Sequence, residues 1–267
     1  MDSVQLMETD PRRWTEALRD SHEALVAQVT RLVPDQLHVG SYCRGWDIAQ
    51  VLSHLGSGAE IGLLGLERAL VDAPPLERGA FPVIWDRWNS LSPMDKVAAM
   101  VVWDRRFVSV LQCVEERTLS SLQVELFGRS LSGTSIAALR LGEHALHSWD
   151  VAVAFDPVAE VLPTSVDLLI DRVPFIAGRL GKAEKASGKE QIEIRTFRPQ
   201  RRFFLSVFER VALTERFDRD AEGTLELPSA ALLRLVYGRL DPRHTPPGVH
   251  VEGRADLDEL RQIFSGF

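Results

Sequence analysis

The sequence predicts a helix bundle followed by a small domain that mixes helices with a sheet, an α plus α+β fold. Apolar residues recur every three or four positions through most of the first 155 residues, as in amphipathic helices. Short runs of alternating apolar and polar residues occur only after about residue 190. A connector with two prolines spans 156–163, so we expect domains at residues 1–157 and 158–267.

Length and composition narrow the class of protein. The chain has 267 residues, of which 45% are hydrophobic and 26% charged, as in an ordinary globular protein. Its net charge of −7 argues against nucleic-acid binding, which depends on clustered basic residues. The N-terminus does not resemble a signal peptide, and no apolar run approaches the roughly 20 residues that span a bilayer. We therefore expect a cytoplasmic protein with no nucleic-acid or membrane partner.

The first domain should contain four long helices. They are expected from about Pro11 to Val33, from Asp47 to Val71, onward from Ser92-Pro93, and from Ser132 or Thr134 to Phe155, with a short helical piece at 83–89. Asp47 is the expected N-cap of the second helix, and Gln50 three residues later completes a capping-box pattern. Such bundles hold their sites in the core, between facing helices.

The second domain should contain both helices and strands. A helix is expected at about 164–180, disturbed at Pro174. Strands are expected at 191–197, 202–209, 211–217, 223–227 and 248–253, with further helices at 228–237 and 255–264.

Three side chains are candidate metal ligands. Glu143 and His147 lie four residues apart on the fourth helix, and this spacing places both on one face. His54 is a polar member of the apolar stripe of the second helix. Two imidazoles and one carboxylate suit a divalent transition metal and leave a position open, as in catalytic zinc sites. Spacing alone favours the alternative, in which His54 is a core histidine and the other two form an ordinary helical pair.

Neighbouring residues add further alternatives. His144 faces about 100° away from Glu143 and is expected at the surface or in helix packing. Asp150 is either a partner that orients an imidazole or a solvated carboxylate. Cys43 precedes the second helix. We expect it to be a buried or idle thiol and rank that role above the role of a metal ligand.

Three separated phrases resemble the mycothiol-dependent maleylpyruvate isomerase family, within the larger group of DinB-like bundles. They are GWDIAQVLSHLGSG at 45–58, RLGEHALHSWDVAVAF at 140–155, and VYGRLD with VHVEGRADLDELRQIF between 236 and 264. The resemblance implies an N-terminal DinB-like four-helix bundle followed by a small C-terminal α+β domain.

The resemblance also implies a site. Carried over residue by residue, it makes His54, Glu143 and His147 the ligands of a divalent metal, zinc or a similar ion, that binds the thiolate of mycothiol. Arg239 is the best match to a functional arginine of the family's C-terminal domain, which would hold a substrate carboxylate or hydroxyl. Its alternative role is to cap the carbonyls of the preceding helix. The chain departs from the family pattern in the longer segment Asp241 to Gly248.

The function we expect is that of a metal-dependent thiol transferase. Mycothiol or a similar small thiol would be the cosubstrate, and its metal-bound thiolate would attack an electrophilic small molecule. A mycothiol-dependent cis-trans isomerase of the maleylpyruvate type is the first alternative. We rank transfer above isomerisation because the segment Asp241 to Gly248 suggests a reshaped pocket. The alternative of another class is a non-catalytic bundle that binds a metal or a protein partner.

Overall fold

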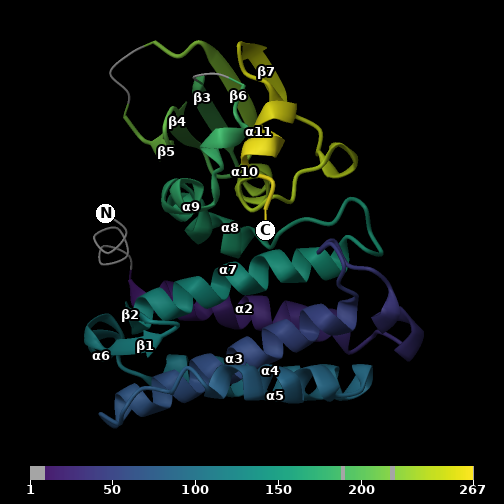
Figure 1. Cartoon of the computed structure of the whole chain (residues 1–267), viewed down its shortest axis with the longest axis vertical. Coiled ribbons are helices and arrows are strands. Elements are labelled where there is room, and N and C mark those ends of the chain that lie inside the picture. Colours follow the sequence, from purple (N-terminus) through teal and green to yellow (C-terminus); the bar gives the residue numbers. More distant parts are fainter. Residues whose placement is uncertain (1–9, 188–189, 217–219, 267) are drawn as a thin grey trace. The chain divides into compact units, whose positions relative to one another are not determined.

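The chain divides into two compact units, of which one ends at Ala159 and the other begins at Glu160 (Figure 1). The structure is a computed structural model that describes residues 10–187, 190–216 and 220–266. Long helices make up the first unit and a five-stranded sheet with short helices the second, so the predicted α plus α+β class is confirmed. Within the described ranges, no helix is long and apolar enough to cross a membrane.

Four long helices form the bundle of the first unit. They are α2 (Pro11–Val29), α3 (Ile48–Leu70), α5 (Pro93–Cys113) and α7 (Gly133–Ala152). Helices α2 and α3 each pack against both α5 and α7, and the short α4 (Ala80–Ser90) packs on α3. The first helix is shorter than predicted because Pro34 holds Val33 in an extended conformation.

Side-chain caps fix where the site-bearing helices begin. Asp47 accepts a hydrogen bond from the Gln50 backbone N–H at 2.7 Å and caps α3 as predicted. The side chain of Gln50 bonds Asn89 instead of returning to the cap, so only half of the capping box forms. Ser132 accepts from the Ser135 N–H at 3.0 Å, which makes Ser132 the cap of α7.

A glycine on α3 allows a large aromatic ring into the bundle. A Cβ atom at Gly56 would lie 2.2 Å from the Trp88 ring of α4, so only glycine fits there. The Trp88 indole N–H donates to Glu60 of α3 at 2.7 Å, and Trp88 is 1% exposed. Together these contacts hold α4 against α3.

A small β-hairpin precedes α7 and was not predicted. After α6 (Glu116–Ser121), strands β1 (Gln123–Leu126) and β2 (Arg129–Ser132) pair in antiparallel fashion. The two-residue turn has positive φ at Phe127 (52°) and Gly128 (74°), which matches the right-handed twist of a hairpin. Phenylalanine is unusual at such a position, and each strand has only four residues, so the pattern carried little signal.

The second unit is built on one mixed sheet. Its strands are β3 (Glu190–Phe197), β4 (Arg201–Val207), β5 (Val211–Thr214), β6 (Gly223–Pro228) and β7 (His250–Gly253), in the order β5-β4-β3-β6-β7. Only β3 and β6 are parallel. Phe217, the end of one predicted strand, lies outside the described residues.

Short helices accompany the sheet. The predicted disturbance near Pro174 is confirmed, because a turn of 3₁₀ helix at 170–172 separates α8 (Pro163–Leu169) from α9 (Val173–Leu180). Helix α10 (Ser229–Val236) follows β6 and packs on it, and α11 (Leu257–Ile263) follows β7.

Candidate metal centre

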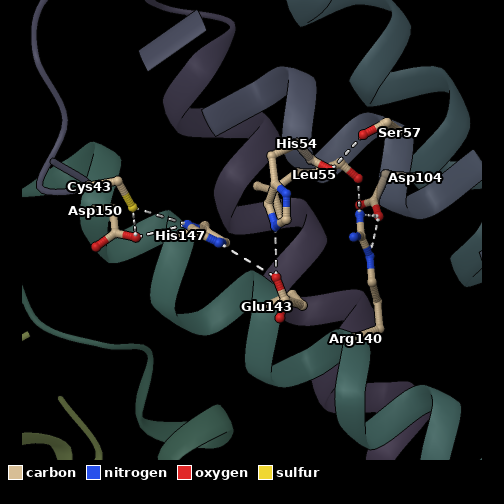
Figure 2. Close-up of polar contacts among 9 residues, drawn as sticks. All are labelled: Cys43, His54, Leu55, Ser57, Asp104, Arg140, Glu143, His147 and Asp150. Atoms are coloured by element: carbon tan, nitrogen blue, oxygen red, sulfur yellow. Dashed lines mark hydrogen bonds and ion pairs between the residues drawn. The ribbon is translucent and has the colours of Figure 1, made fainter. Parts of the chain in front are cut away.

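The structure brings the three predicted ligands together between α3 and α7 (Figure 2). His54 comes from α3, whereas Glu143 and His147 come from adjacent turns of α7. Their ligand atoms all lie within 4.8 Å of one another. The Nε2 atoms of His54 and His147 lie 3.0 and 3.5 Å from the same oxygen of Glu143, Oε2.

Burial differs across the cluster and gives it an open side. The side chains of His54 and Glu143 are 41% and 40% exposed, whereas that of His147 is 10% exposed. Helix α3 packs against α7, which places the turn that carries His54 opposite the turns that carry the other two residues. The cluster is therefore anchored in the bundle through His147 and accessible through the other two residues.

Asp150 orients His147. Its carboxylate is fully buried, and its Oδ2 atom lies 2.8 Å from Nδ1 of His147. Of the two roles considered for Asp150, the geometry fits the orienting partner. A carboxylate that accepts the Nδ1–H of a histidine leaves the Nε2 lone pair available to a metal.

Cys43 joins the same network from the segment before α3. Its thiol donates to Oδ2 of Asp150 at 3.1 Å and lies 3.8 Å from Nδ1 of His147 (Figure 2). The half-buried thiol is thus not idle, as one alternative had it, but part of the shell around His147. No sequence pattern predicts this contact, because Cys43 and His147 are 104 positions apart.

Hydrogen bonds decide the charges of the cluster. Burial would raise the pKa of Glu143, but hydrogen bonds from His147 and His54 outweigh it and hold that pKa well below the usual range. Burial would lower the pKa of His147, yet its bonds with Asp150, Cys43 and Glu143 raise that pKa well above the ordinary value. These hydrogen bonds therefore favour an ionised Glu143, the form in which a carboxylate binds a cation, and a protonated His147, which would lose its proton when a metal binds.

The donor set fits a divalent metal. Two imidazole nitrogens and one carboxylate oxygen converge, with an open side and an oriented histidine. A second trio, Cys43 with His147 and Asp150, also meets the distance requirement. It suits a metal less well, because the thiol and the carboxylate already bond each other and Asp150 is fully buried.

Trp46 is a further site residue that sequence reasoning missed. Its ring lies 5.3 Å from the ring of His54 and 6.3 Å from that of His147, stacked on the latter at 23°. It stands beside the cap residue Asp47, in the phrase GWD that begins α3. Its position next to a helix cap on the approach to the cluster could have suggested a role in shaping the site.

A buried polar cluster lies behind the candidate centre. Asp104 of α5 is fully buried and accepts bonds from Arg140 (2.6 Å) and His144 (2.9 Å) of α7 and from His22 (2.5 Å) of α2. His144 is therefore a helix-packing residue and not a surface one. Burial would raise the pKa of Asp104, but His144 and Arg140 hold it well below its usual value. Burial lowers the pKa of His144 despite the nearby carboxylate, so the imidazole is neutral.

A pocket of about 250 Å³ borders the cluster within the first unit. His54 and Glu143 form part of its wall, along with Ser57, Gly58 and Arg140. Most of the remaining lining is apolar and comes from α3, α4, α5, the hairpin and α7. These residues include Ile61, Trp85, Phe107, Leu126, Phe127 and Leu139.

Arg239 lies in the second unit, just after α10. Its Nη1 atom donates to the carbonyl of Tyr237 at 3.0 Å, a contact of the capping kind. The following segment is ordered around Asp241, which caps a short 3₁₀ turn, and around Arg234, which donates to the carbonyl of His244 at 2.9 Å. A substrate-binding role for Arg239 stays a prediction.

Comparisons with known proteins agree with the helical architecture. Residues 18–152 match the family model described as the mycothiol maleylpyruvate isomerase N-terminal domain. Two solved structures, of the mycothiol-dependent maleylpyruvate isomerase and of its histidine-to-alanine mutant, each superpose with a TM-score of 0.67. They are 14% and 13% identical to the chain and cover 92% of it and 94% of their own length, a likeness of fold. No curated protein sequence matches the chain.

Proposed function

Because the chain belongs to the mycothiol maleylpyruvate isomerase family through residues 18–152, we propose that it is a metal-dependent enzyme using mycothiol or a similar small thiol as cosubstrate. The observation that carries the proposal is the convergence of His54, Glu143 and His147 beside an open pocket. Transfer of the thiol to an electrophilic small molecule is the reaction we rank first, with cis-trans isomerisation as the alternative.

The three converging residues would hold the metal, and zinc is our first choice for two imidazoles and a carboxylate. When bound, such a metal lowers the pKa of a thiol ligand, so that the thiolate is available at neutral pH. Asp150 keeps the His147 ring in one orientation by accepting its Nδ1–H. The thiol of Cys43 donates a hydrogen bond to Asp150 and so restrains the carboxylate of Asp150.

The same first step serves both reactions. The thiolate forms an S–C bond to an electrophilic carbon of the acceptor, and the electron pair of the acceptor's double bond moves to its carbonyl group. In transfer, the S–C bond remains, and the carbon next to the carbonyl takes up a proton. In isomerisation, the former double bond rotates, the S–C bond breaks, and the thiolate and double bond are restored.

We propose that Arg239 holds a carboxylate or hydroxyl oxygen of one of the two substrates in this reaction. The support is its residue type and its place in the phrase YGRLD, while its bond to Tyr237 supports the capping alternative. The segment from Asp241 to Gly248, which contains a 3₁₀ turn capped by Asp241, is the departure from the family pattern on which we rank transfer above isomerisation.

Metal content and mycothiol binding test the proposal together. The purified protein should contain a divalent metal, and calorimetry should detect mycothiol binding that is lost on chelation and restored when zinc is added back. Mycothiol binding that is indifferent to the metal, or no binding to the metal-loaded protein, would contradict the proposal. Such a result would point instead to a non-catalytic metal-binding bundle.

A further inference from the structure

The pocket beside His54 and Glu143 has little capacity to bind polar groups. The Ser57 hydroxyl donates to the carbonyl of His54 at 3.1 Å, and His54 itself bonds Glu143. Most other lining side chains are aliphatic or aromatic, and Trp85, Phe127 and Leu139 are 41%, 52% and 44% exposed. Removing an apolar ligand from water into this lining is favourable, whereas a polar group there needs a specific partner.

Arg140 supplies that partner. Its Nε and Nη2 atoms donate to Asp104, and Nη2 also donates to the carbonyl of Leu55. Within the described ranges, the third nitrogen, Nη1, donates no hydrogen bond to a protein acceptor. Nη1 lies next to Gly58, 3.3 Å from the position that a Cβ atom would take on that glycine. Gly58 and Arg140 both line the pocket, and in Figure 2 the guanidinium lies between Asp104 and the His54–Glu143 pair.

Charge limits what Arg140 can receive. Asp104 already pairs with the guanidinium, so Nη1 offers a hydrogen bond without an unpaired positive charge. A carboxylate on a ligand would lie against the apolar lining without a countercharge of its own, and burying an unpaired charge is costly. The pocket therefore suits one hydrogen-bonding oxygen on an otherwise apolar body.

We propose that the acceptor of the thiol chemistry is an apolar carbonyl electrophile, bound in this pocket with its oxygen on Nη1 of Arg140. The inference rests on the proposed function and names its substrate class. When the thiolate adds to a carbon conjugated with the carbonyl, an S–C bond forms and the double-bond electrons move toward that oxygen. Nη1 then donates to an oxygen on which negative charge develops, and the neighbouring carbon takes the proton that the thiol released.

Unreactive ligands test the pocket without turnover. Binding of 4-phenylbutan-2-one, a saturated ketone with an aromatic ring, is measured by saturation-transfer NMR on the protein after chelation, so that no metal is present to hold a carboxylate. Succinate, a short dicarboxylate, should bind at least about tenfold more weakly, because a hydrogen bond to a charged donor cannot offset two buried carboxylates. Succinate binding as tight as that of the ketone would overturn the proposal.

A matched ligand pair tests Arg140, because removing Arg140 would leave Asp104 buried without its countercharge. Butylbenzene keeps the ring and chain of the ketone and lacks its oxygen. We expect it to bind on the order of tenfold more weakly than the ketone, the effect of one lost bond to a charged donor. Equal binding of the two would remove the role of Arg140.

A variant of the hairpin tests the location. Phe127→Asn removes the aromatic wall, and asparagine tolerates the positive φ of that position. The ketone should bind about fivefold more weakly, from the lost aromatic contact, while Val158→Asn, at a 79% exposed valine outside the pocket lining, should leave binding unchanged. Unchanged binding in the Phe127 variant would contradict the assignment.

The binding experiments also separate this inference from the proposed function. If the ketone binds as described and mycothiol does not bind, the proposed function fails while the apolar site stands.

Discussion

At the residue scale, His147 is the centre of the candidate site. Its two ring nitrogens face different partners, with Asp150 and Cys43 near Nδ1 and Glu143 near Nε2. The four-residue spacing correctly predicted that Glu143 and His147 share a face. It could not predict the contact with Cys43, because that depends on how the segment before α3 passes over α7.

Removing one ligand tests the set. His54→Ala should abolish metal binding, because a carboxylate and a single imidazole leave too few protein donors for a tight site. Cys43→Ser should retain a full equivalent of metal, since the thiol belongs to the shell around His147. Elemental analysis of the purified variants measures both. Full occupancy in the first variant, or loss of metal in the second, would favour the trio of Cys43, His147 and Asp150 instead.

At the scale of elements, caps and periodicity predicted the four long helices. The hairpin before α7 and the buried polar cluster could not be predicted in this way, because they depend on contacts between elements. The cap at Asp47 is local, so the sequence was enough to place it, whereas Ser132 and Thr134 were both possible caps of α7 and the structure selects Ser132. The hairpin of β1 and β2 escaped prediction because its turn uses Phe127 where asparagine or aspartate is usual. Asp104 escaped as well, since its partners come from two other helices.

The contact between α3 and α4 can be tested by adding one methyl group. Gly56→Ala should destabilise the protein by about 1–3 kcal/mol in urea unfolding, because the new Cβ would overlap the Trp88 ring. In the absence of that overlap, the same change inside a helix would stabilise it by up to about 1 kcal/mol. Whether the free energy of unfolding falls or rises therefore shows whether the Trp88 ring packs on Gly56.

Gly178→Ala in α9 is the matched control, since the nearest atom to its new Cβ would be 3.7 Å away. This control should be neutral or stabilising. A stabilising Gly56→Ala would mean that Trp88 does not pack against α3 as described.

The buried cluster of α2, α5 and α7 should make stability depend on pH. Burial lowers the pKa of His144 in the folded protein, so below about pH 6.5 the unfolded chain binds a proton that the folded chain does not. The stability from neutral His144 is thus complete above that pH and is lost as the pH falls. Asp104, whose pKa is also lowered, adds a second loss below about pH 3.9.

His144→Gln isolates the first contribution, since the other titrating groups are common to both proteins. Urea unfolding at pH 7 and pH 5 should show a smaller acid-induced loss in this variant than in the unchanged chain. The difference in slope should stay below about 1.4 kcal/mol per pH unit, the value for one whole proton. An identical pH dependence would show that His144 titrates alike in both states.

At the scale of the whole molecule, the chain combines a helical unit that carries the family's domain with a second unit built on a mixed sheet. Separated phrases in the right order predicted the family, and residues 18–152 confirm it. The phrase around Arg239 falls outside that range, so its function stays a prediction, as does a cytoplasmic location.

Arg239 tests whether the second unit takes part in the reaction. Arg239→Ala should lower kcat by at least about tenfold, because a lost bond to a charged donor removes roughly 1.5–3 kcal/mol of stabilisation. Metal content should be unchanged, since the candidate ligands belong to the first unit. Arg243→Ala, at an exposed neighbouring arginine, is the control. Unchanged turnover of the Arg239 variant would assign that residue to helix capping.

The central claim is that the metal held by His54, Glu143 and His147 binds the sulfur of mycothiol. Cobalt(II)-loaded protein titrated with mycothiol tests it, because a thiolate ligand gives cobalt a sulfur-to-metal charge-transfer absorption in the near ultraviolet. We expect that band to rise to saturation at one equivalent, and to be absent with the serine analogue of mycothiol and in His54→Ala. Mycothiol that binds the cobalt protein without producing the band would contradict the claim.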